Sequence, residues 1–307
     1  MVKVEPSQTW AIGTHEQTLL VNSVGETRAT CTYQGETVEV PLSRFEQWEI
    51  VATLGDDYGG RNMVNEQSEW LSPSEANLLS AAMVKAPPWL ADRTILLTRA
   101  GSRAYGTSVP GSDSDFRGVA IAPLRYYLGF AQGFERFVFD GQAEGEIEDI
   151  RVFMRAACNG EPQVLAVLFC DDRDVVRATD AGRALRAARG RFLSRRMAKP
   201  FAGHARSIVT RWSKGQPVTS KEAATAVRLV RMLAEILVAG VVCVRRHDAD
   251  ELLAIRRAEQ SVEDALKEAA EGLARVDAWA AASLLPEQPD REWLDAFCAE
   301  QIAARAA

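Results

Sequence analysis

The sequence predicts an α+β protein, because its pattern of apolar residues changes along the chain. Residues 1–52 contain β-formers in short runs about ten residues apart. Residues 93–165 alternate predicted strands with loops, and residues 166–307 have a mostly helical pattern. A linker and one helix are expected over residues 53–92. A chain of 307 residues can bury a sizeable core and divide into such parts.

The N-terminal part predicts a small antiparallel β-barrel. Its expected strands are Thr18–Val21, Thr27–Tyr33, Thr37–Val40 and Phe45–Val51. This part has no readable binding motif, so we expect a structural role or contact with a partner protein. Glycines and aspartates at 55–60 then predict a linker.

Helix signals follow the linker and dominate the C-terminal part. Ser72 predicts a helix start, and Pro87–Pro88 ends that helix. Ser261 predicts another start. A long helix is expected where apolar residues recur on one face, at Val227, Val230, Ala234, Leu237 and Val241.

Charge and composition exclude several classes of function. The formal net charge of -6 argues against a protein that wraps long nucleic acid, because that affinity comes from neutralising many phosphates; a short RNA end remains compatible with it. The most apolar run, Ile236–Val244, is too short to span a membrane, and no signal-peptide pattern is present. The five cysteines form no CxxC pair, which predicts reduced thiols and a cytoplasmic protein.

A phosphate-binding loop is predicted where the apolar run Ile95–Leu97 leads into Gly101 and Ser102. Glycine permits a tight turn in which backbone amides approach a phosphate closely. The hydroxyl of Ser102 adds a donor. Arg103 either contacts a phosphate or caps a helix end.

Two carboxylates downstream predict a metal site. Asp113 and Asp115 lie two residues apart, so on an extended chain both leave one face and can bind hard divalent cations through oxygen. The segment is also ordinary turn sequence. The glycine loop upstream and an expected strand at Phe116–Ile121 downstream favour the metal site.

The runs GSRAYGT at 101–107, SDSD at 112–115 and RGV at 117–119 resemble the nucleotidyltransferases of the DNA polymerase β superfamily, in its bacterial and phage branch. The resemblance extends from about Ile95 to Leu294. It implies a polymerase-β-like core, an NTP substrate and Mg²⁺ or Mn²⁺ as cofactor.

The resemblance also implies roles for individual residues. Asp113 and Asp115 would be catalytic metal ligands. Gly101, Ser102 and Arg103 would bind the nucleotide, joined by two residues that lie seven apart on one predicted helix face, Lys221 and Arg228.

The superfamily's chemistry uses a two-metal mechanism and needs a third carboxylate, because two metals must be bridged while the attacking hydroxyl is activated. Three glutamates that alternate along an expected strand are the candidates. Counting back from the helix that begins near Ile150, the usual acid of the branch falls on Glu144, which would then be a metal ligand. The apolar neighbours in the strand equally allow Glu146, and Glu148 ranks third. Both Glu144 and Glu146 therefore remain candidates.

The chain departs from the branch at three positions, where it has Glu161, Ala166 and Thr225. Loss of groups that support the site would mean an altered acceptor, slow turnover or an inactive site. We therefore expect transfer of NMP from an NTP to a hydroxyl, with an RNA 3′ end favoured over a protein side chain or a small alcohol. The alternative is a non-catalytic regulator that binds nucleotide or RNA.

A basic run contains no acid and is either a solvated helix face or a surface beside the active site that receives phosphate groups. Its members are Arg183, Arg186, Arg189, Arg191, Arg195, Arg196 and Lys199.

Overall fold

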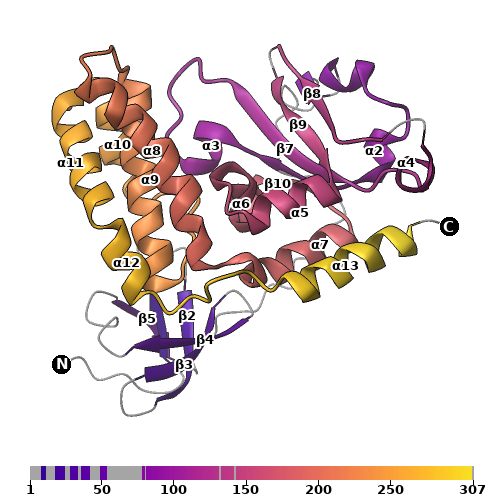
Figure 1. The fold of residues 1–307 in the computed structure, drawn as a ribbon, viewed down its shortest axis with the longest axis horizontal. Coiled ribbons are helices and arrows are strands. Elements are labelled where there is room, and N and C mark those ends of the chain that lie inside the picture. The colour runs from indigo at the N-terminus through magenta and orange to yellow at the C-terminus, as the bar shows by residue number, and fades with distance from the viewer. Residues whose placement is uncertain are drawn as a thin grey trace. The chain divides into compact units, whose positions relative to one another are not determined.

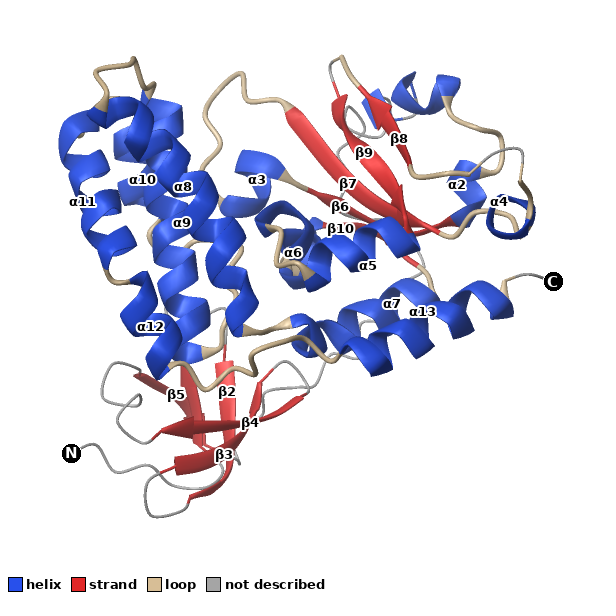
Figure 2. Ribbon diagram, viewed as in Figure 1, coloured by secondary structure: helices blue, strands red, loops and turns tan. Residues whose placement is uncertain are grey.

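The computed structural model describes residues 8–11, 18–24, 28–33, 36–41, 49–53, 78–79, 81–130, 133–141 and 143–305. The chain divides into two compact units, Met1–Glu66 and Gln67–Ala307. Figure 1 follows the chain from end to end, and Figure 2 separates helices from strands. Each unit has a β-sheet of its own.

The described strands of the first unit form a five-stranded antiparallel sheet in the order β4-β3-β2-β1-β5. The strands are β1 (Gln8–Ala11), β2 (Thr18–Val24), β3 (Arg28–Tyr33), β4 (Glu36–Pro41) and β5 (Glu49–Thr53). Four of them overlap the expected strands. The sequence did not predict β1, and the start of the expected strand Phe45–Val51 lies outside the described residues. Closure of this sheet into a barrel stays a prediction.

The second unit contains a mixed sheet in the order β10-β6-β7-β9-β8. Strands β7 and β9 are parallel, and the other neighbours are antiparallel. The strands are β6 (Thr94–Arg99), β7 (Ser114–Ala120), β8 (Arg136–Phe139), β9 (Ala143–Asp149) and β10 (Val175–Ala178). Because β10 pairs with β6, the sheet extends past the expected boundary at residue 165.

Each face of this sheet packs against a core, because alternate apolar residues of β6 and β7 point to opposite sides. Leu96 and Val119 face the larger core, which continues into the helices. Leu97 and Phe116 face a smaller core that Leu78, Leu79 and Trp89 cover. The predicted linker at 55–60 and the predicted helix start at Ser72 lie outside the described residues. The described part of that helix is helical at 78–79 and 81–82 and continues as a 3-10 turn, Met83–Lys85, before the two prolines.

Helices account for most of the second unit. Around the sheet lie α2 (Leu90–Arg93), α3 (Gly101–Tyr105), α4 (Arg125–Leu128), α5 (Ile150–Cys158), α6 (Pro162–Phe169) and α7 (Asp180–Ala187). The later helices are α8 (Ala198–Ser213), α9 (Ser220–Ala239), α10 (Ala249–Arg256), α11 (Val262–Ala274), α12 (Val276–Ala282) and α13 (Arg291–Ala304). Figure 1 shows α8, α9 and α11 packed as a bundle beside the sheet.

Helix α9 is the long helix that the apolar periodicity predicted. Thr219 and Glu222 form a capping box at its start, and Gly240 ends it in the left-handed conformation, with φ of 72°. Its apolar face, which includes Val227 and Leu237, is buried in the larger core. The predicted start at Ser261 is also confirmed, because its side chain accepts a hydrogen bond from the amide of Asp264.

Two glycine substitutions in helices should have opposite effects on stability. A Cβ atom on Gly182 would overlap the carbonyl oxygen of Ile95, where α7 packs on β6, whereas Gly203 has open space around it in α8. We expect Gly182→Ala to lower the free energy of unfolding by about 1–3 kcal/mol and Gly203→Ala to raise it by about 0.4–1 kcal/mol. Urea unfolding followed by circular dichroism measures both, and equal effects would contradict the close packing of α7 on the sheet.

Candidate functional site

The two halves of the predicted motif lie against each other. Gly101 follows β6 and has φ of 59°, and the amide of Ala100 donates a hydrogen bond of 2.8 Å to the carbonyl oxygen of Asp115 on β7. A Cβ atom at position 101 would overlap the Asp115 carboxylate. Glycine is therefore needed both for the left-handed turn and for the approach of this carboxylate to the loop.

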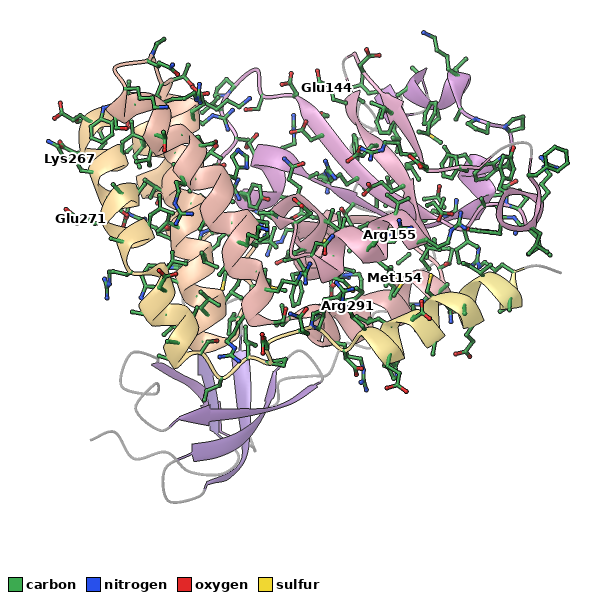
Figure 3. All side chains as sticks on the ribbon, viewed as in Figure 1. Glu144, Met154, Arg155, Lys267, Glu271 and Arg291 are labelled. Atoms are coloured by element: carbon green, nitrogen blue, oxygen red, sulfur yellow. The ribbon has the colours of Figure 1, made fainter. Side chains whose placement is uncertain are left out.

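The parallel pairing of β7 with β9 places Asp115 beside Glu144. Residues opposite each other in register point to one face of a sheet. Figure 3 labels Glu144 at the upper edge of the sheet. Burial raises the pKa of Asp115, and the negative charges of Asp113 and Glu144 raise it further. Three of the expected carboxylates therefore act on one another electrostatically.

The strand register also separates the candidates for the third acid. Glu146 lies opposite Arg117 and is ion-paired with it at 2.5 Å, with a second contact of 3.4 Å to Arg136. Glu148 is one register step further from Asp115 and is buried, which raises its pKa. Only Glu144 of the three lies directly beside Asp115, so the geometry favours Glu144 over Glu146 as the third acid.

Positive charge reaches Asp115 from two elements. Lys221, at the start of α9, and Arg103, in α3, both lower the pKa of Asp115, against the larger effects of burial and the neighbouring carboxylates. The Nε of Arg103 also donates a hydrogen bond of 3.3 Å to the carbonyl oxygen of Asp113. Both residues thus lie at the site where the sequence predicted nucleotide contacts.

Arg228 lies two turns after Lys221 and contacts the motif loop in a different way. Its guanidinium stacks on the ring of Tyr105, 3.7 Å from the ring centroid, and donates a hydrogen bond to the sulfur of Met232. Tyr105 is buried and ends α3. Arg228 therefore holds the helix that begins at Gly101.

The sequence did not reveal the groups that fix the back of the loop. The carbonyl oxygen of Tyr105 accepts a hydrogen bond of 3.1 Å from the amide of Arg246. Arg256, at the end of α10, donates to the carbonyl oxygen of Thr107 and to the hydroxyl of Ser112. The two residues of each of these pairs are separated by more than a hundred positions in the sequence. A local sequence pattern therefore cannot predict the contacts.

The donor atoms at this edge suit a hard divalent cation. Carboxylate oxygens are the ligands that Mg²⁺ and Mn²⁺ prefer, and mutual repulsion of the three acids is a reason for a cation to bind. Asp113 and Glu144 are exposed, and Asp115 is half-buried beside them. Within the described residues, however, no three acidic, histidine or cysteine side chains are close enough together to hold one metal ion.

The three positions that depart from the resembled branch have local roles. Glu161 is exposed at the start of α6, and its carbonyl oxygen accepts the first hydrogen bonds of that helix. Ala166 is buried in the larger core. The hydroxyl of Thr225 bonds to the carbonyl oxygen of Lys221 within α9.

Several arginines of the basic run form ion pairs within the fold. Arg186 pairs with Asp172 and Arg191 with Asp290, and Arg183 pairs with Asp180. In Figure 3 the start of α13, where Arg291 is labelled, lies far from Glu144 across the second unit. The pair between Arg191 and Asp290 places Arg191 near that helix start and away from Glu144. A phosphate-receiving surface formed by the other members of the run stays a prediction.

One of three comparisons with known proteins identifies a family. The model of the RNA repair pathway DNA polymerase beta family, RlaP, matches residues 90–300. A nucleotidyltransferase-like protein of solved structure from Exiguobacterium sibiricum 255-15 is similar over 66% of this chain and 72% of that chain, with 10% sequence identity and a TM-score of 0.26. The search of curated proteins found no match. In the part of the chain that the structure describes, no helix combines the length and apolar character needed to cross a membrane.

The carboxylate arrangement can be tested by titration alone. Asp113→Asn or Glu144→Gln should lower the pKa of Asp115, because each removes a negative charge that raises it, and Lys221→Met should raise this pKa further. The ion-paired Glu146 serves as the control, and Glu146→Gln should shift the Asp115 pKa less than Glu144→Gln does. Carbon-13 NMR of labelled aspartate measures the pKa directly. A larger shift in Glu146→Gln would show that the third acid is misassigned.

Proposed function

The chain belongs to the RNA repair pathway DNA polymerase beta family, whose model covers residues 90–300, and on this premise we propose that it transfers a nucleoside monophosphate from an NTP to a hydroxyl. One observation carries the proposal: Asp115 lies between the glycine loop at Gly101 and the carboxylate of Glu144. A phosphate-binding turn and an acidic edge therefore meet at a single point of the fold.

In the proposed reaction the acceptor oxygen forms a bond to the α-phosphorus of the NTP. The bond from that phosphorus to the bridging oxygen breaks, and pyrophosphate leaves with the electron pair. Asp113, Asp115 and Glu144 would together hold Mg²⁺ or Mn²⁺ once the exposed side chains of Asp113 and Glu144 turn toward Asp115. The cation would neutralise phosphate charge and lower the pKa of the attacking hydroxyl.

The residues of the chain have distinct roles in this proposal. The backbone amides of Gly101 and Ser102 direct the positive ends of their dipoles at the phosphates. Lys221 and Arg103 balance the negative charge of the phosphates. Glu144 is the exposed acid beside Asp115 and accepts the proton of the acceptor hydroxyl. Arg228 keeps α3 in place through Tyr105. Fixed charges that face the reacting phosphate contribute most of the rate in such transfers.

We propose an RNA 3′ end as the acceptor, ahead of a protein side chain or a small alcohol. The family's description names an RNA repair pathway. The net charge of -6 suits recognition of a short end rather than a long duplex. Within the described residues, four cysteines are reduced thiols outside any disulfide, which suits the reducing cytoplasm.

A second candidate is a protein that binds nucleotide or RNA without catalysis. The observation that favours it is the set of changed positions, since Ala166 is buried in the larger core and the hydroxyl of Thr225 bonds within α9. Incubation with each labelled NTP, Mg²⁺ and total RNA separates the two functions. Covalent label on RNA supports transfer, whereas reversible binding without label supports the regulator.

Substitution of the acids should divide them into two groups. Asp113→Asn, Asp115→Asn and Glu144→Gln should each lower the rate of label transfer about 100-fold or more, because each removes a charge that faces the reacting groups. Glu146→Gln should retain most of the activity, since Glu146 is engaged with Arg117. Single-turnover kinetics with saturating NTP measures the rates. Full activity in Asp113→Asn and Asp115→Asn would refute the proposed enzyme.

A further inference from the structure

Arg256 connects the end of α10 to the segment just before Asp113. Its Nη1 donates a hydrogen bond of 3.0 Å to the carbonyl oxygen of Thr107, and its Nη2 donates one of 3.2 Å to the hydroxyl of Ser112. The same hydroxyl accepts a hydrogen bond of 2.9 Å from the amide of Val109. The planar guanidinium thus fixes both ends of the loop that separates the glycine turn from the first carboxylate.

The backbone of Arg256 makes a second connection. Its carbonyl oxygen accepts a hydrogen bond of 2.8 Å from the hydroxyl of Ser220, the first residue of α9. Lys221 follows directly and is one of the two cations that act on Asp115. A single residue therefore has partners immediately before Asp113 and immediately before Lys221.

The turn that follows Arg256 holds this end of α10 in place. The amides of Glu259 and Gln260 both donate to the carbonyl oxygen of Ala254, at 2.9 and 3.1 Å. Ala258 adopts a left-handed conformation with φ of 58° to make this turn possible. The position of the guanidinium is therefore set by the helix end and not by a flexible tail.

We propose that Arg256 is a positioning residue that sets where Asp113 and Lys221 lie around Asp115. The inference rests on the proposed function, which assigns metal binding to Asp113 and nucleotide binding to Lys221. The hydrogen bond to Ser112 connects Arg256 to the segment before Asp113, and we call this connection the Asp113 arm. The hydrogen bond from Ser220 connects Arg256 to the residue before Lys221, and we call this connection the Lys221 arm. Removal of a group that orients a metal ligand typically lowers metal affinity or activity by about 10–100-fold.

The experiment replaces Arg256 and compares it with its neighbour. Arg256→Met removes the fork, while Arg257→Met makes the same change of charge at an exposed side chain. Titration with Mn²⁺ alone, followed by electron paramagnetic resonance, reports metal affinity without any turnover. We expect Arg256→Met to weaken Mn²⁺ binding and lower kcat by about 10-fold or more, Arg256→Lys to fall between, and Arg257→Met to match the unchanged protein.

The two serines separate the arms. Ser112→Ala should weaken Mn²⁺ binding and leave the affinity for the NTP that labels best unchanged, whereas Ser220→Ala should weaken binding of that NTP and leave Mn²⁺ binding unchanged. In this design Ser112→Ala removes only the hydroxyl that Arg256 and Val109 share. It decides the Asp113 arm by itself if Arg256→Met does not fold.

Asp113→Asn distinguishes failure of this inference from failure of the proposed function. Unchanged Mn²⁺ affinity in folded Arg256→Met, together with its loss in Asp113→Asn, would overturn the positioning role and leave the metal site intact. Unchanged Mn²⁺ affinity in both variants would instead overturn the metal site on which the proposed function depends.

Discussion

The contact between Gly101 and the carboxylate of Asp115 constrains the rest of the site. Any side chain at position 101 would occupy the volume of that carboxylate. Gly101 follows β6, and Asp115 belongs to β7. The antiparallel pairing of these two strands therefore brings the glycine loop and the Asp115 carboxylate together. The parallel pairing with β9 then determines that Glu144 lies next to Asp115. One missing Cβ atom and two strand registers thus place Asp115 and Glu144 at the acidic edge.

Local patterns were enough to predict most of the fold. The apolar periodicity of α9 and the cap at Ser261 depend on residues within a few positions of one another, and both are confirmed. Strand β10 is short and makes its only described strand pairing with β6, about eighty residues earlier, through a register shift. Its strand partner is distant in the sequence, so neither the composition nor the apolar periodicity around it predicted a strand. The domain boundary expected at residue 165 therefore divided the sheet.

The site shows the same limit at the scale of single residues. Gly101, Asp113 and Asp115 lie in one short segment and were predicted from it. The choice among the glutamates could not be made, because residues of a strand that alternate share one face and only the register with β7 distinguishes them. The two interpretations of the basic run could not be separated for a related reason: Asp172 and Asp290, which lie outside the run, pair with Arg186 and Arg191 from other segments.

Under the proposed function, the balance of charge at the edge would link metal binding to nucleotide binding. Asp113, Asp115 and Glu144 face two cations, Lys221 and Arg103, and the raised pKa of Asp115 shows that burial and repulsion exceed the compensation. A triphosphate adds negative charge to an edge that already carries an excess of it. Repulsion between like charges at short range is strong where water is partly excluded. Under the proposed function, divalent cations would offset the repulsion between the triphosphate and the acids, so each ligand would favour binding of the other. The hydrogen bond from Arg256 to Ser112, next to Asp113, would reduce the rearrangement needed when they bind.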